Sequence, residues 1–179
     1  MRMICRFMDK NDEIIFFIKK YLELDKQRAR EEEMAVLTKL IALDPRCETP
    51  YRDFYFNYYY NRGVLYGYLS QWDKAIADYT KAIEINPRHD LAWGNRGVCY
   101  SDLGNLDNAV SDVAMAVKVN PGTIHSLNLP NMYYWRVKKN MKEGRADKAI
   151  EDCNYLIANF QDNYLIKEVR KMLNEIILK

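Results

Sequence analysis

The feature that most constrains this chain of 179 residues is an internal repeat with a period of 34 residues. When residues 59–87 are placed on residues 93–121, 12 of 29 positions are identical, whereas ordinary composition gives about two. The identical pairs are Asn61/Asn95, Arg62/Arg96, Gly63/Gly97, Val64/Val98, Tyr66/Tyr100, Leu69/Leu103, Asp73/Asp107, Ala75/Ala109, Asp78/Asp112, Ala82/Ala116, Asn86/Asn120 and Pro87/Pro121. A period of this length predicts stacked copies of one supersecondary unit.

Each unit contains two stretches with helical spacing, in which small and aromatic residues recur at i, i+4 and i+7. In the first unit these are Tyr59, Gly63 and Tyr66, followed by Ala75, Tyr79 and Ala82. A glycine inside a helix costs about 1 kcal/mol relative to alanine, so its recurrence indicates a close approach of two helices. We expect Gly63 to face Ala75 and Ala82, and Gly97 to face Ala109 and Ala116.

Helix breaks are expected at equivalent places in both units. Ser70-Gln71 and Gly104-Asn105 end the first helix of each unit. Pro87 and Pro121 stop the second helix, because the residue before a proline is disfavoured in the helical conformation. Low glycine and proline content, at 7 and 5 residues, also favours long helices over a many-stranded sheet fold.

The residues match a known family pattern at this point. The spacing of Trp93, Gly97, Tyr100, Ala109, Ala116 and Pro121, with its 34-residue period, resembles the tetratricopeptide repeat. The resemblance is close in the two central units and weaker outside them. It implies an all-α fold, an α-solenoid of tetratricopeptide-type helical hairpins with a concave groove.

A third unit follows at an offset of 40 instead of 34, so six residues are inserted, roughly at 124–129. Its matches to the second unit are Gly144, Asp147, Ala149 and Asp152. The predicted organisation is an irregular N-terminal helical region over 1–49, three repeats at about 50–89, 90–123 and 130–161, and a C-terminal capping helix over 162–179. For that last helix, a membrane-surface helix and a dimer interface are rival readings.

The N-terminal region leaves two alternatives open. Residues 14–24 and 37–43 fit a degenerate hairpin, but the absence of glycine and proline over 25–33 also allows one helix over about 12–43. Thr49-Pro50 resembles an N-cap followed by proline at the first helical position, which predicts a helix from about 50 to 69.

Every clear unit carries an arginine 16 residues before an aspartate. The pairs are Arg62 with Asp78, Arg96 with Asp112 and Arg136 with Asp152. Because they recur in register with the packing positions, we interpret them as structural ion pairs between helices and not as parts of an active site.

The family resemblance implies which first-helix positions face the groove. They are Asn57, Tyr60, Asn61, Val64 and Tyr68 in the first unit, Leu91, Gly94, Asn95, Val98 and Asp102 in the second, and Asn131, Tyr134, Trp135, Lys138 and Lys142 in the third. An amide both donates and accepts hydrogen bonds, and tyrosine and tryptophan are frequent binding anchors. The partner-binding candidates are Asn57, Tyr60, Asn61, Tyr68, Asn95, Tyr134, Trp135, Lys138 and Lys142.

Two dense segments each have a structural and a functional reading. Six of the seven residues from Phe54 to Tyr60 are aromatic, so rings point all round that helix. Either residues 14–43 cover them, or part of them forms an exposed groove. Basic residues crowd residues 136–148, either as a solvated face or as a site for an acidic ligand. Some family members clamp a carboxylate with Lys, Asn, Asn, Lys and Arg, but only Asn61 and Asn95 match, whereas Asn57, Asn131 and Trp135 stand at the other positions.

The remaining features exclude classes of function. The chain has no phosphate-binding glycine loop, no Gly-x-Ser-x-Gly and no His-Glu-x-x-His, so it is not expected to be an enzyme or to carry a cofactor or metal. A net charge of +2 gives no basic field for nucleic acid, and no apolar run reaches the ~20 residues of a membrane span.

The four cysteines, Cys5, Cys47, Cys99 and Cys153, have no metal-site spacing. We read them as reduced thiols of a cytoplasmic protein, with Cys99 and Cys153 in the core. The expected function is a protein–protein interaction module, an adaptor or scaffold that binds a peptide or helix of a partner protein in the groove. The alternative is a chaperone or co-chaperone, and a homo-oligomer through the terminal helix is possible in either case.

Overall fold

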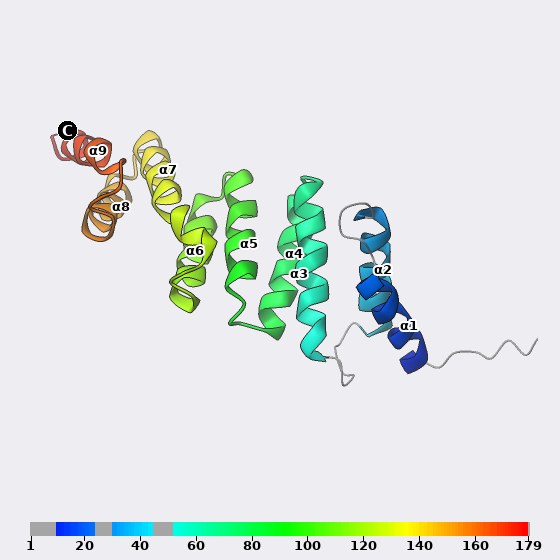
Figure 1. Cartoon of the computed structure of the whole chain (residues 1–179). Helices are drawn as coiled ribbons and strands as arrows, with labels where there is room; N and C mark the ends of the chain where they lie inside the picture. Colours follow the sequence, from blue (N-terminus) through cyan, green and yellow to red (C-terminus); the bar gives the residue numbers. More distant parts are fainter. Residues whose placement is uncertain (1–9, 24–29, 45–51, 179) are drawn as a thin grey trace, which may run out of the picture. The chain divides into compact units, whose positions relative to one another are not determined.

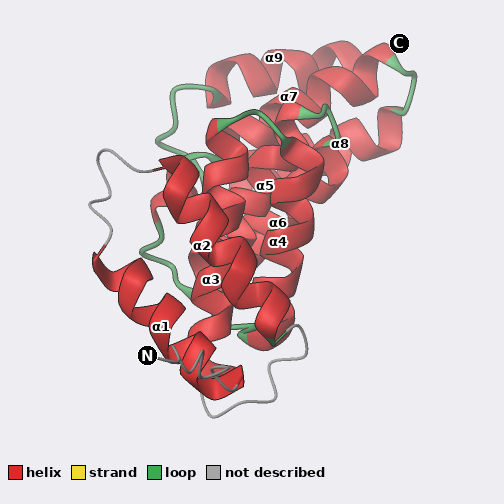
Figure 2. Ribbon diagram, turned by 90° about the vertical axis from the view of Figure 1, so that its right-hand side faces the viewer, coloured by secondary structure: helices red, strands yellow, loops and turns green. Residues whose placement is uncertain are grey.

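The computed structural model describes residues 10–23, 30–44 and 52–178. These residues form helices and connecting turns without strands, which confirms the all-α prediction (Figures 1 and 2). The elements are α1 (Lys10–Glu23), α2 (Arg30–Leu43), α3 (Arg52–Tyr68), α4 (Trp72–Ile85), α5 (Asp90–Asp102), α6 (Leu106–Val119), the 3-10 helix η1 (Ile124–Leu127), α7 (Leu129–Lys142), α8 (Ala146–Asn159) and α9 (Ile166–Ile177). They fall into two compact units, Met1–Pro87 and Arg88–Lys179.

In the first unit, α1 and α2 are two separate helices that contact each other, and α2 also contacts α3. A single straight helix over 12–43 is therefore not what the structure contains. The unit is completed by the α3–α4 hairpin. The expected helix start at Thr49-Pro50 lies outside the described residues.

The N-terminal helices cover much of the aromatic segment of α3. Tyr55 is fully buried, and its hydroxyl donates a hydrogen bond to the carbonyl oxygen of Leu40 in α2 at 3.3 Å. Tyr58 is also buried and meets the ring of Tyr21 in α1 edge to face, with centroids 5.7 Å apart. For these two tyrosines the structural reading of the segment is confirmed. Large rings with a polar tip can fill such a core because the hydroxyl finds a partner.

In the second unit, α5–α6 and α7–α8 are hairpins, and α9 packs on α8 (Figure 1). One apolar core joins α6, α7, α8 and α9. The buried face of α9 consists of Ile166, Val169 and Met172, at helical spacing. Helix α9 thus covers the apolar side of α8.

The turns between helices follow the predicted breaks. Gly104 and Gly144 both have φ of 73°, the left-handed conformation that glycine adopts without steric cost. Ser70 holds the equivalent place in α3–α4 at φ 55°. Asn105 caps α6 by accepting a hydrogen bond from the backbone N–H of Asn108, and α4 and α6 end before Asn86 and Asn120 as expected.

Close approach at the mid-helix glycines is present; its partner differs from the expectation at Gly63, whereas at Gly97 it includes the expected Ala109. A Cβ on Gly63 would lie 2.8 Å from Cε1 of Tyr79, so the tyrosine ring and not the flanking alanines faces this glycine. A Cβ on Gly97 would lie 2.7 Å from Cγ2 of Val113 and 3.0 Å from the carbonyl oxygen of Ala109. The prediction was wrong for Gly63 because Tyr79 lies between the two alanines along the same face and its ring extends further.

Two cysteines lie in the described core. Cys99 and Cys153 are free and buried, as predicted, and burial raises the pKa of each thiol to about 11. A thiol with so high a pKa is a poor nucleophile at neutral pH. Cys5 and Cys47 lie outside the described residues.

Replacing Gly97 with alanine is expected to lower the free energy of unfolding by about 1–3 kcal/mol, because the backbone carbonyl of Ala109 cannot move out of the way of the new methyl group. Gly67→Ala is the matched control. Its Cβ would meet only the Tyr79 hydroxyl at 3.8 Å, so the helix preference of alanine is expected to raise stability by up to about 1 kcal/mol. Urea unfolding followed by circular dichroism measures both. Equal effects of the two changes would show that no close contact exists at Gly97.

Candidate partner-binding surface

Each clear hairpin is joined by a two-point ion pair between its helices. The guanidinium of Arg62 donates to the carboxylate of Asp78 through two nitrogens, both at 2.7 Å. Arg96 and Asp112 repeat this geometry at 2.7 and 2.9 Å. In the third hairpin, Arg136 and Asp152 are joined at 2.9 and 2.6 Å. The structural reading of the 16-residue spacing is confirmed.

These pairs are largely removed from water. The aspartates are only 4–5% exposed. Hydrogen bonding to Asp78 raises the pKa of Arg62 above its ordinary value, so the guanidinium stays charged at any ordinary pH. Two parallel N–H donors fit one carboxylate, which fixes the relative position of the helices as well as neutralising the buried charge.

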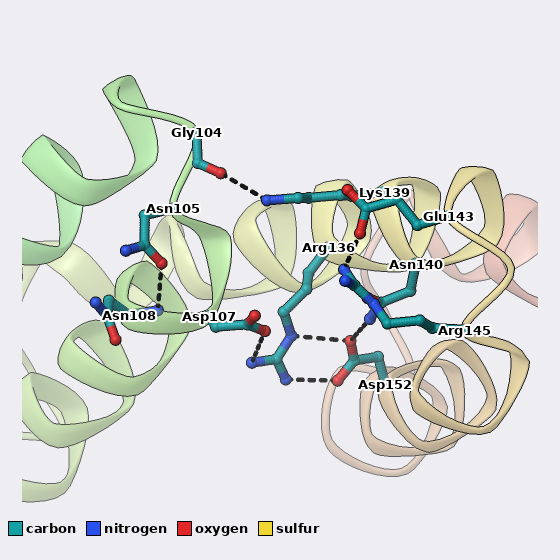
Figure 3. Close-up of polar contacts among 10 residues, drawn as sticks. All are labelled: Gly104, Asn105, Asp107, Asn108, Arg136, Lys139, Asn140, Glu143, Arg145 and Asp152. Carbon is teal, nitrogen blue, oxygen red and sulfur yellow. Dashed lines mark hydrogen bonds and ion pairs between the residues drawn. The ribbon is translucent and has the colours of Figure 1, made fainter.

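The third pair belongs to a wider network, drawn in Figure 3. Arg136 also lies 3.7 Å from Asp107 at the start of α6. Asn140, which is buried, donates to Asp152 at 3.4 Å and accepts from Arg145 at 2.8 Å. The network therefore connects α6, α7 and α8 around a small polar pocket.

Much of the predicted basic run is used inside this network. Lys139 donates to the carbonyl oxygen of Gly104 at 2.9 Å, and Arg145 also pairs with Glu143 (Figure 3). Of the run, Lys138, Lys142 and Lys148 remain exposed. Fewer basic side chains of the run are thus available to an acidic ligand than the number of its lysines and arginines indicates.

In the first unit, the expected groove residues have different surroundings. The amide nitrogen of Asn61 donates to the hydroxyl of Tyr21 at 2.5 Å, so α1 already engages this side chain. Tyr60 is half-buried beside Tyr79, with ring centroids 5.9 Å apart. Asn57 is half-buried, and Tyr68 is exposed.

Tyr68 borders a pocket that the sequence did not indicate. The guanidinium carbon of Arg30 lies 4.7 Å from the centre of the Tyr68 ring, a cation–π contact. The pocket has a volume of about 200 Å³ and lies between α2 and α3, lined by Arg30, Glu31, Met34, Leu65, Tyr68 and Leu69. The α2 part escaped prediction because the sequence left open whether residues 12–43 form one helix or a hairpin.

In the second hairpin, one expected groove position is covered. The ring of His125, from η1, occupies the space that a Cβ on Gly94 would need. Gly94 is therefore buried under the inserted segment instead of lining an open groove, which corrects the prediction for this residue. Asn95, one position further on, is half-buried.

The first helix of the third hairpin presents a cluster of candidates, of which only Tyr134 is half-buried and the others are exposed. We define the α7 surface as Tyr134, Trp135, Lys138 and Lys142. Trp135 is 54% exposed, and its ring lies 5.5 Å from that of Tyr134. The Lys138 ammonium lies 5.1 Å from the Trp135 ring and 5.4 Å from the Tyr134 ring. The sequence-predicted residues are brought together here.

One neighbour of the α7 surface was missed by sequence reasoning. Tyr164, in the turn before α9, donates its hydroxyl to the side-chain oxygen of Asn131 at 2.9 Å and is itself exposed. Asn131 is thereby occupied by a neighbouring segment. The sequence offered no signal for this contact, since Tyr164 lies outside the helical repeat pattern.

The described ranges contain no group of three or more His, Cys, Asp or Glu side chains placed to hold a metal ion. None of the described helices is long and apolar enough to cross a membrane.

Comparison with family models identifies the repeats. Two tetratricopeptide repeat models match the chain, one over residues 56–89 and the other over residues 78–111. No curated protein sequence matches the chain. The family prediction is thus confirmed over 56–111.

Several solved structures share the fold. The first TPR domain of Spaghetti (RPAP3), bound to the HSP90 peptide SRMEEVD, has 22% identity and a TM-score of 0.56, covering 66% of this chain and 89% of that one. The second TPR domain of human RPAP3, in complex with the HSP70 peptide SGPTIEEVD, has 21% identity and a TM-score of 0.56, covering 69% and 97%. The Hsp90 co-chaperone Cns1 from Saccharomyces cerevisiae has 20% identity and a TM-score of 0.62, covering 84% and 49%. At these identities the likeness concerns the fold alone.

Changing Arg96 to leucine is expected to lower the free energy of unfolding by about 3 kcal/mol, because it leaves the Asp112 carboxylate buried without its guanidinium. Lys81→Leu is the matched control, since its pair with Glu84 is exposed on both sides and its loss should cost less than about 1 kcal/mol. Chemical denaturation compares the two. A loss at Arg96 no larger than that at Lys81 would contradict the structural role of the repeated pair.

Proposed function

Residues 56–111 of this chain are tetratricopeptide repeats, and on this premise we propose that the protein is a non-enzymatic adaptor. It binds a peptide or helix of a partner protein on the first-helix faces of its repeats. The support from the fold is general: RPAP3 domains of the same architecture hold peptides of HSP90 and HSP70. A shared fold does not determine which partner a protein binds, so the proposal rests on the side chains of this chain.

The observation that carries the proposal is the α7 surface. Trp135 is a large, stiff side chain left half in water beside Tyr134, and Lys138 lies over both rings. Aromatic side chains of this kind dominate binding energy when a partner covers them. Among the expected groove residues, Asn61 already bonds to Tyr21 and Gly94 lies under His125, whereas Trp135 remains accessible.

The chemistry of the α7 surface selects a class of ligand. Lys138 and Lys142 place two positive charges along the exposed side of α7, about one turn apart. A partner segment that inserts an apolar or aromatic side chain against Trp135 and carries a carboxylate next to it would satisfy both features. We propose that this segment belongs to a cytoplasmic protein. Asn57, Tyr60 and Tyr68 in the first unit and Asn95 in the second remain proposed partner contacts, each within its own unit.

The alternative is a co-chaperone that grips the carboxylate end of a chaperone peptide. Asn61 and Asn95 occupy the asparagine positions of that clamp, but Asn57, Asn131 and Trp135 replace its basic residues. Loss of three positive contacts weakens carboxylate binding strongly, because each charge-assisted hydrogen bond contributes about 1.5–3 kcal/mol. The adaptor is therefore the favoured function.

The test is a peptide-library selection on the whole chain, followed by affinity measurement on the double variant Trp135→Ala/Lys138→Ala. We expect selected peptides to bind the wild-type chain near micromolar Kd and the variant at least about tenfold more weakly, a loss of about 1.4 kcal/mol. Isothermal titration calorimetry measures both.

The matched control is Lys167→Ala/Ile177→Ala, which also removes one exposed lysine and one exposed apolar side chain, but from α9. It should bind like the wild type. If this control weakened binding and the α7 variant did not, the partner site would lie on α9. Binding of SRMEEVD or SGPTIEEVD in the same assay would favour the co-chaperone, and mass measurements at rising concentration would detect a homo-oligomer formed through α9.

A further inference from the structure

The inserted segment η1 has an inverted distribution of polarity. Its two apolar side chains, Ile124 and Leu127, are 71% and 79% exposed, whereas His125 between them is only 4% exposed. The segment contacts α5, α6 and α7, so it lies at the junction of the second and third hairpins. The ordinary arrangement is the reverse, since isoleucine and leucine are among the residues most often buried and histidine is intermediate.

The imidazole of His125 packs against α5 at a position where the helix has no side chain. It lies against Gly94, where any larger residue would displace it. The position equivalent to Gly94 in the first repeat is Tyr60, which packs its own ring beside Tyr79. In the second repeat, the helix lacks that side chain, and the insertion supplies a ring in its place.

The contact between His125 and its surroundings contains no hydrogen bond to the imidazole. Among the described residues, no group bonds to Nδ1 or to Nε2. Burial lowers the pKa of His125 below its ordinary value, and the nearby Asp90 of α5 opposes this only in part. The ring is therefore neutral at pH 7, which suits an enclosed site.

Other charged groups on the elements packed against η1 give little compensation. On α6, Lys118 in the last turn is exposed and has the wrong sign for stabilising an imidazolium. On α7, the first charged residue is Arg136, which is already paired with Asp152. Asp90 itself accepts a hydrogen bond from Asn120 at 3.1 Å.

We propose that η1 is a pH-sensitive switch, in which neutral His125 holds the segment on Gly94 and protonation of the ring releases it into solvent. Release frees the N-terminal part of α5 and loosens the junction of the second and third hairpins. Because the folded pKa lies below the unfolded one, the contact is fully stabilising above about pH 6.5 and weakens as the pH falls through and below that value.

Hydrogen–deuterium exchange of the whole chain, corrected for the intrinsic pH dependence of exchange, tests the switch at about pH 7.5 and about pH 5.5. We expect exchange over residues 123–128 to rise by up to about tenfold at the lower pH, because pH 5.5 lies about one unit below the ordinary histidine pKa of about 6.5. Peptides from α3 and α4 should stay unchanged. Equal protection of 123–128 at both pH values would overturn the proposal.

The sequence contains two histidines, so His89 provides the matched control. His89→Asn keeps a side-chain acceptor for the N–H of Ala92 and should retain the pH response. His125→Leu should abolish it. If the His89 variant lost the response and the His125 variant kept it, His89 would be the titrating residue and the proposal would be overturned.

Gly94→Ala provides a variant that needs no change in pH. The added methyl group should expel the His125 ring, so exchange over 123–128 should be fast at both pH values while α7–α9 remain protected. Continued protection of 123–128 in this variant would overturn the contact itself. These measurements involve no partner, so their outcome is independent of the proposed adaptor function.

Discussion

A bidentate ion pair between the two helices of each clear hairpin is the interaction around which the rest is arranged. The carboxylates of Asp78, Asp112 and Asp152 are nearly inaccessible to water, and a buried charge without a partner would cost several kcal/mol. The arginine must therefore reach across at one distance and one angle. Helix packing at Gly63 and Gly97, which lets the helices approach closely, is compatible with that requirement. Charge neutralisation and close packing thus select the same geometry.

The third hairpin shows what happens when the repeat pattern weakens. At the offset of 40 residues, Val137 and Leu156 stand where the second unit has Gly97 and Ala116. The apolar core around them extends into α9. The ion pair is retained and extended by Asn140 and Arg145 (Figure 3). The polar contacts are kept while the apolar packing changes, and Trp135 stays 54% exposed on α7.

Sequence reasoning predicted what depends on periodicity and could not predict what depends on insertions. The helices, the turns at Ser70 and Gly104, and the three ion pairs follow from spacings that local geometry dictates. The seating of His125 on Gly94 does not, because an inserted segment has no repeat register to place it. Likewise, the partner of Asn61 is Tyr21, 40 residues away, and no pattern in the sequence links the two. Tyr79 was assigned to the correct face, but the reach of its ring was underestimated.

The left-handed turn at Gly104 bears on how separable the hairpins are. The carbonyl oxygen of Gly104 is satisfied by Lys139, and Asp107 just beyond it lies beside Arg136. Both partners come from α7, so the turn that closes the second hairpin is completed by the third. The second hairpin is therefore linked to the third by these two contacts: excised after α6, it would keep its internal ion pair and lose both of them. Side chains of the third repeat thus complete the turn between the two helices of the second.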